Sequence, residues 1–310
     1  MVPRWRSSLV RRSTGQRLSR RPEGGRDLDA LRGALVDGAA SAGGGVASGL
    51  RTARRAAASV GDGRREATIM AAAYGVYLVV RGLWGGTLEE GRANAAALIE
   101  RERDLGIWVE PAWQRAFAEN NLGLPAWSAF YVLSQVIVLP LALFLVYRHR
   151  RASYAFLRNM ALLSWAGGLA WYALQPVAPP RLIASGLEDT VSTQTPVALD
   201  SDLVRLVYNP VAAMPSLHVG MAPVVAWALW RLTPWWWSRA LGLVYPVLVS
   251  VAVVVTGNHY VLDIAGGVAV VLPAAVVAAW LARAPGGAPT VPGGSPPSDG
   301  SGPLPRAAPP

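Results

Sequence analysis

The chain has 310 residues, of which 52% are hydrophobic and 15% are charged, and it contains no cysteine. This balance excludes an ordinary soluble domain, a disulfide framework and thiol chemistry. The net charge of +10 comes from arginine, because the chain has no lysine, and fourteen arginines against six acids lie in residues 1–66. A basic arm ahead of apolar segments indicates contact with anionic lipid headgroups, and no nucleic-acid partner is expected.

The two ends of the chain have the composition of unfolded segments. Residues 1–66 are rich in Arg, Gly, Ala and Ser and show no sustained apolar period, which predicts a disordered cytoplasmic arm. Residues 284–310 are rich in Pro, Gly and Ser and are predicted to be a disordered cytoplasmic tail. The folded domain is therefore expected at 67–283.

The domain contains six apolar runs, each close to the twenty residues that a hydrocarbon core requires. The predicted spans are 67–86, 125–147, 154–175, 215–234, 239–257 and 259–282. Between the first two, residues 87–124 have apolar residues at helical spacing and more acids than arginines, which indicates one or two amphipathic helices at the membrane interface. The sequence predicts an all-α integral membrane bundle of six transmembrane helices.

The distribution of arginine predicts the orientation. The arm, the 148–158 loop and the Arg231–Arg239 loop are basic, whereas the 87–124 segment and the 176–213 loop are acidic or mixed. The positive-inside rule then places both termini in the cytoplasm and the starts of the fourth and sixth spans at the outer face of the cell membrane.

Two of the three histidines open predicted spans. One motif is Met214-Pro215-Ser216-Leu217-His218, and the other is Thr256-Gly257-Asn258-His259-Tyr260-Val261-Leu262-Asp263. Ionisable groups at membrane depth are rare and face the bundle interior, so they are functional candidates by default. His259 and Asp263 are four residues apart and share one helical face.

These residue types can share the work of phosphoryl transfer. The Asp263 carboxylate can accept the proton of one ring nitrogen of His259, which leaves the other nitrogen as nucleophile or base. His218 can donate a proton to a leaving oxygen. Ser216, at a helix start with free N–H groups, and Arg181 of the outer loop can hold a phosphate. This set suits a lipid substrate at the membrane surface.

Further candidates surround this set. Asn258, next to His259, is a candidate for substrate binding. Arg81, near the end of the first span, is either an interfacial arginine that reaches for the membrane surface or a phosphate ligand. The 182–209 loop is a candidate lid over the site.

Other interpretations of the same residues stay open. A lone histidine is often structural, as we interpret His149, and a His–Asp pair four apart is often a structural hydrogen bond. His218, His259 and Asp263 could instead form a metal site of two histidines and one carboxylate, or the two histidines could ligate haem. A membrane scaffold or transporter with an inactive site is the non-catalytic alternative.

The two motifs resemble the second and third signature motifs of the type 2 phosphatidic acid phosphatase superfamily, in particular its inositolphosphotransferase and sphingomyelin-synthase-like branch. The resemblance implies that His259 is a nucleophile that forms a phosphohistidine and that Asp263 orients it. It also implies that His218 is the general acid and base and that Ser216 contacts the phosphate. The resemblance covers about 67–283 and is sharpest across 176–267.

Three departures separate the chain from the phosphatases, and the first two resemble the transferase-like branch. The phosphatases have glycine where this chain has Leu217, and an arginine six residues before the third-motif histidine, where this chain has Val253. Their first motif has a lysine seven residues before Arg-Pro, a place that Leu174 takes relative to Arg181.

Two phosphate-binding cations of the phosphatases are thus missing, and Arg181, with Arg81 or Arg205, is expected to replace them. The resemblance implies a lipid phosphotransferase that passes a phosphoryl or headgroup phosphate to an alcohol, without metal or cofactor. A phosphatase for a lipid phosphate or polyprenyl pyrophosphate is the alternative.

Overall fold

The computed structural model describes residues 46–83, 86–184, 186–197 and 209–283. The chain divides into two units, Met1–Thr52 and Ala53–Pro310. Residues 46–58 form a helix, so this part of the arm is helical where the sequence predicts disorder. The predictions for residues 1–45 and for the tail at 284–310 lie outside the described residues.

The described part of the second unit is helical, with no strand and one isolated bridge between Val177 and Ala212. The elements are α2 (Gly63–Leu83), α3 (Leu88–Asp104), α4 (Glu110–Glu119), α5 (Leu124–Leu133), the π-helical turn η1 (Ser134–Val138), α6 (Leu139–His149), α7 (Arg151–Leu174), the 3₁₀ turn η2 (Pro180–Leu182), α8 (Thr190–Gln194), α10 (Leu217–Leu232), α11 (Trp236–Val255) and α12 (Val261–Ala282).

Four helical segments of the described chain are long and apolar enough to cross a membrane. They are Gly63–Leu83, Leu124–His149, Trp236–Val255 and Val261–Ala282, and they coincide with the first, second, fifth and sixth predicted spans. The third predicted span is α7, which contains the buried polar residues Arg158 and Asn159 and is not among the four. The fourth is α10, which is apolar but has only 16 residues. A helical membrane protein is supported, and six crossings remain a prediction.

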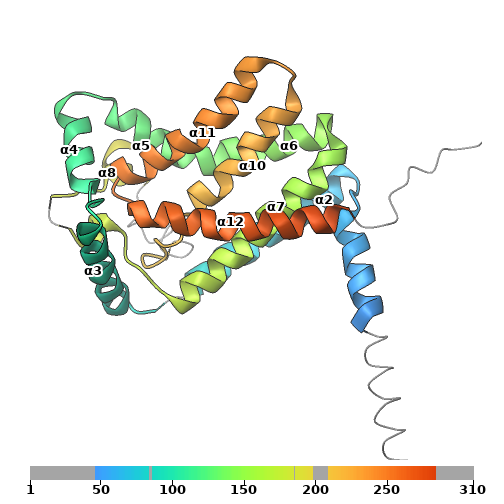
Figure 1. The fold of residues 1–310 in the computed structure, drawn as a ribbon, viewed down its shortest axis with the longest axis horizontal. Helices are drawn as coiled ribbons and strands as arrows, with labels where there is room; N and C mark the ends of the chain where they lie inside the picture. Colours follow the sequence, from blue (N-terminus) through green and yellow to red (C-terminus); the bar gives the residue numbers. More distant parts are fainter. Residues whose placement is uncertain (1–45, 84–85, 185, 198–208, 284–310) are drawn as a thin grey trace, which may run out of the picture. The chain divides into compact units, whose positions relative to one another are not determined.

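Helices α3 and α4 confirm the helices predicted between the first two spans. The Thr87 side chain caps α3 by accepting a hydrogen bond from the Glu90 N–H, at 3.1 Å. Figure 1 shows α3 and α4, with α8, at the end of the bundle where α12 begins, and α3 contacts α12. Two acids of this segment, Glu102 and Glu110, are completely buried instead of facing solvent.

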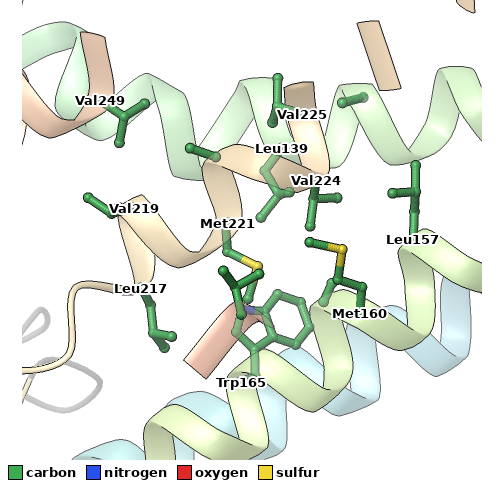
Figure 2. Packing of buried hydrophobic residues seen from close by; sticks show 14 of the residues in the cluster. Leu139, Leu157, Met160, Trp165, Leu217, Val219, Met221, Val224, Val225 and Val249 are labelled. Carbon is green, nitrogen blue, oxygen red and sulfur yellow. The ribbon is translucent and has the colours of Figure 1, made fainter. Parts of the chain in front are cut away.

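Helix α10 is central to the bundle, because it contacts α6, α7, α11 and α12. Figure 2 shows its apolar side chains interleaved with those of the neighbouring helices. The labelled residues are Leu139, Leu157, Met160, Trp165, Leu217, Val219, Met221, Val224, Val225 and Val249. Lipid is as apolar as these side chains, so close packing rather than exclusion from water stabilises helix contacts within a bilayer.

The starts of α10 and α12 approach each other at Gly267. A Cβ atom at this position would overlap the carbonyl oxygen of Ser216 and lie 3.1 Å from the backbone nitrogen of Gly220. Only a residue without a side chain allows this approach. The contact brings the two histidine motifs together.

We expect Gly267→Ala to destabilise the protein by about 1–3 kcal/mol, because the new methyl group overpacks the α10–α12 contact. This loss should exceed the roughly 1 kcal/mol that alanine contributes over glycine in a helix. Thermal unfolding in detergent would measure the change. Gly75→Ala is the matched control, because a Cβ there meets nothing within 4 Å. A Gly267→Ala variant as stable as Gly75→Ala would contradict the close packing.

Candidate active site

His259 lies in the loop between α11 and α12 and is 6% exposed. Its Nδ1 atom is 2.8 Å from the carbonyl oxygen of Ala213 and 3.1 Å from Oδ2 of Asp263. A backbone carbonyl can only accept a hydrogen bond, so Nδ1 carries the ring proton. In the neutral ring, Nε2 therefore keeps its lone pair.

The surroundings of His259 favour this neutral ring. The pKa of His259 is lowered to about 3, first by burial and then by the positive charges of Arg81 and Arg181, against the Ala213 hydrogen bond, which raises it. Both arginines therefore act on the ring electrostatically. The guanidinium of Arg81 also lies 5.8 Å from the ring centre of Tyr172. The sequence left open whether Arg81 belongs to the site, and its contact with a phosphate stays a prediction.

Asp263 is the third residue of α12 and is completely buried. Its Oδ2 also accepts a hydrogen bond from the Tyr260 N–H at 3.0 Å, and its carbonyl oxygen accepts one from the Ser216 N–H at 3.1 Å. One residue thus orients His259, caps α12 and joins α12 to the segment before α10.

His218 is the second residue of α10. The ring centres of His218 and His259 are 5.9 Å apart in a T-shaped arrangement, so the fold brings the two predicted histidines together. Tyr131 of α5 stacks on His218 at 4.0 Å and lies 6.3 Å from His259. Tyr131 lies three residues before the start of the π-helical turn η1, and such turns are frequent at functional sites. The position of Tyr131 was not predictable from the sequence, because nothing distinguishes it from other aromatic residues in apolar spans.

Ser216 is the N-cap of α10 and is completely buried. Its Oγ accepts a hydrogen bond from the Val219 N–H at 3.5 Å, and its carbonyl accepts one from the Gly220 N–H at 2.9 Å. The preceding carbonyl, of Pro215, accepts a hydrogen bond from the Tyr172 hydroxyl at 3.0 Å. The structure thus gives Ser216 a capping role, and its contact with phosphate remains a prediction.

Arg181 is docked against the segment that carries His259. Its backbone N–H donates to the Gly257 carbonyl at 3.1 Å, and its Nη1 donates to Oδ1 of Asn258. Its Nε lies 3.4 Å from Oδ2 of Asp189, and the Arg181 side chain is 2% exposed. The Asn258 amide nitrogen donates to the carbonyl and hydroxyl of Thr256, at 3.2 and 3.0 Å. Asn258 therefore holds Arg181 beside the site, a role that its sequence position did not reveal.

Two further predictions lie wholly or partly outside the described residues. Arg205 lies outside them, as does the 198–208 part of the candidate lid. Within the lid segment, the structure describes α8, where Asp189 caps the helix by accepting a hydrogen bond from the Ser192 N–H at 3.2 Å.

Two buried acids outside the histidine motifs reach the start of α12. The Glu110 carboxylate accepts a hydrogen bond from the Val261 N–H at 2.8 Å, and the Glu102 carboxyl accepts one from the Leu262 N–H at 2.7 Å. Burial is the main cause that raises the pKa of Glu102, to about 9, and burial also raises the pKa of Glu110. A sequence signal for Glu102 existed, because it is four residues after Leu98 on the buried face of α3.

The metal interpretation gains no geometric support. In the part of the chain that the structure describes, no three His, Asp or Glu side chains are grouped so that they could hold one ion. Oδ2 of Asp263 already accepts hydrogen bonds from His259 and the Tyr260 N–H.

Comparison with known proteins gives a match to a protein family. A family model described as the PAP2 superfamily matches residues 96–277, which is more than half of the chain and includes both histidine motifs and Arg181. Searches of curated proteins and of solved structures gave no match. The matched range begins within α3 and ends within α12, so it also includes the two buried acids. The chain belongs to the PAP2 superfamily.

Proposed function

We propose that this protein is a membrane enzyme that moves the phosphate group of a phospholipid or lipid phosphate through a phosphohistidine on His259. One observation carries the proposal. The Nδ1 proton of His259 is held between the Ala213 carbonyl and the Asp263 carboxylate, which leaves Nε2 as a free nucleophile. A second imidazole, His218, lies beside it to handle the proton.

In the first half-reaction, Nε2 of His259 attacks the phosphorus of the lipid. A P–N bond forms as the bond between phosphorus and the leaving oxygen breaks, and His218 gives its proton to that oxygen. The bound anionic phosphate favours the protonated form of His218. Asp263 stabilises the positive charge that develops on the ring of His259.

In the second half-reaction, an acceptor hydroxyl group attacks the phosphohistidine. His218 takes the proton of the acceptor, a new P–O bond forms, and the P–N bond to His259 breaks. Water as acceptor gives hydrolysis, and an alcohol gives transfer. Leu217 before His218 and the missing third-motif arginine favour transfer, as in the inositolphosphotransferase and sphingomyelin-synthase-like branch.

Arg81 and Arg181 are proposed to supply the positive charge around the phosphate. Both lower the pKa of His259 electrostatically, which supports a positive potential around the proposed nucleophile. The asymmetry of arginine in the sequence supports a site at the outer face of the cell membrane, with both termini in the cytoplasm.

His259→Ala should reduce turnover by about 10³-fold or more, because it removes the nucleophile. The assay measures phosphate and headgroup release from lipid phosphates and phospholipids in micelles, with chelator and with or without inositol and other alcohols. His149→Ala is the matched control, because His149 is exposed at the end of α6. Product that forms only with an alcohol and needs His259 supports transfer, whereas free phosphate supports the phosphatase alternative. Full activity in His259→Ala would refute the phosphohistidine.

The same panel tests the remaining alternatives. Loss of activity with chelator would indicate a metal site, and a visible absorption band in the purified protein would indicate haem. Absence of turnover with every lipid, in a folded protein, would favour a scaffold.

The acid limb of kcat/KM should lie below about pH 5, well under the ordinary histidine value of about 6.5. Protonation disables His259 as a nucleophile, and its pKa is lowered to about 3, so the active neutral form persists as the pH falls. A phosphodiester lipid is the suitable substrate, because its phosphate stays singly charged over this range. An acid limb with a midpoint near 6.5 that is unchanged in His149→Ala would show that the ring is not held neutral.

Arg181→Lys should lower kcat/KM by about 10- to 100-fold, because lysine keeps the charge but loses the planar fork that Asn258 and Asp189 hold. Steady-state kinetics with the best lipid of the panel would measure the change. Arg92→Lys, at an exposed position of α3, is the control. Equal kinetics for the two variants would remove Arg181 from the site.

A further inference from the structure

The first turn of α12 is held by side chains that are distant in the sequence. The N–H groups at the start of a helix have no partner within the helix. In α12, Glu110 binds the Val261 N–H and Glu102 binds the Leu262 N–H, across 151 and 160 residues. His259 and Asp263 lie on either side of these two amides, so the acids act on the segment that carries the predicted nucleophile.

The two carboxyl groups form one buried unit. Both residues are 0% exposed, and a side-chain hydrogen bond joins the two carboxyl groups. The pKa of Glu102 is raised to about 9 by burial and, to a smaller extent, by the neighbouring charges of Glu110 and Asp263. Glu102 is therefore protonated at neutral pH, which avoids placing two negative charges side by side.

Further contacts hold the start of α12 in place. Tyr260, the N-cap of α12, donates its hydroxyl proton to the Ala178 carbonyl at 2.9 Å and stacks on Trp108 at 6.1 Å. Trp108 lies in the connection between α3 and α4, which carry the two acids. The charged and titratable groups that act on Glu102 from α12 and its cap are Asp263 and the Tyr260 hydroxyl.

We propose that Glu102 and Glu110 are positioning residues that clamp the first turn of α12 and thereby keep His259 and Asp263 aligned for attack on phosphorus. The inference rests on the proposed function only in naming His259 as the group that is positioned. Neither acid touches the substrate. Their effect on the reaction passes through the amides of Val261 and Leu262.

The decisive comparison is between glutamine and leucine at position 102. Glutamine keeps the accepting oxygen and resembles the neutral carboxyl, whereas leucine removes the acceptor. We expect Glu102→Leu to lower kcat by about 10- to 100-fold, because a misplaced nucleophile costs that much, with little change in KM. Glu102→Gln should keep most of the activity at pH 7. Glu100→Leu, on the exposed face of the same helix, is the matched control.

Hydrogen exchange tests the two hydrogen bonds at the start of α12 without any assay of activity. Exchange of the Val261 and Leu262 amides, measured by mass spectrometry on the full chain in detergent, should quicken at least about tenfold in Glu102→Leu and stay slow in Glu102→Gln and Glu100→Leu. Unchanged exchange in a folded Glu102→Leu variant would overturn the clamp. If Glu102→Leu fails to fold, Glu102→Gln still decides the question through its pH profile.

The alkaline side of the pH profile of kcat gives a second test. In the wild type, Glu102 ionises as the pH rises through about 9, and repulsion from Glu110 should loosen the clamp and lower kcat. Glu102→Gln cannot ionise, so it should keep more of its kcat than the wild type above about pH 9, whereas deprotonation of His218 affects both proteins alike. Identical profiles over the whole pH range would overturn the role of the Glu102 proton. Full activity of His259→Ala would instead refute the proposed function while leaving the exchange result intact, so the two failures are distinguishable.

Discussion

The arrangement of the site depends on a single proton, the one on Nδ1 of His259. Its two acceptors come from different segments, because Ala213 precedes α10 and Asp263 belongs to α12. Ala213 is fixed in turn by its N–H, which donates to the Val177 carbonyl at 3.0 Å, and the Val177 N–H donates to the Val211 carbonyl at 2.7 Å. The contact of Gly267 with Ser216 sets the distance between the two segments. Displacement of either acceptor would free the imidazole to change tautomer.

The amides at the start of α12 and the arginines near His259 have separate roles in the site. Helix starts commonly bind anions, but the first amides of α12 are occupied by Glu110 and Glu102. The positive potential at His259 therefore comes from Arg81 and Arg181, which lie on α2 and η2. The buried acids keep α12 in place, and the arginines of other elements are left to attract a phosphate.

The sequence was sufficient for what lies within one helix or one motif. Apolar runs located the helices, and the spacing of His259 and Asp263 predicted their contact. Contacts between distant segments were not predictable, because spacing reports only neighbours on the same element. Glu102 and Glu110 were therefore grouped with solvent-facing acids. The buried polar face of α7 was likewise missed, since the ion pair of Arg158 with Glu66, at 2.8 Å, joins residues 92 positions apart.

The leucine that replaces a glycine before His218 is explained by packing. Leu217 is 3% exposed and belongs to the apolar core in Figure 2, so its side chain is directed into the bundle. It lies against Gly168 of α7, where an added Cβ atom would be 2.8 Å from a Leu217 methyl carbon. A glycine on α7 thus provides the space that the leucine needs. The side chain of Leu217 therefore packs into the core, while the ring of its neighbour His218 stacks on Tyr131 and lies beside that of His259.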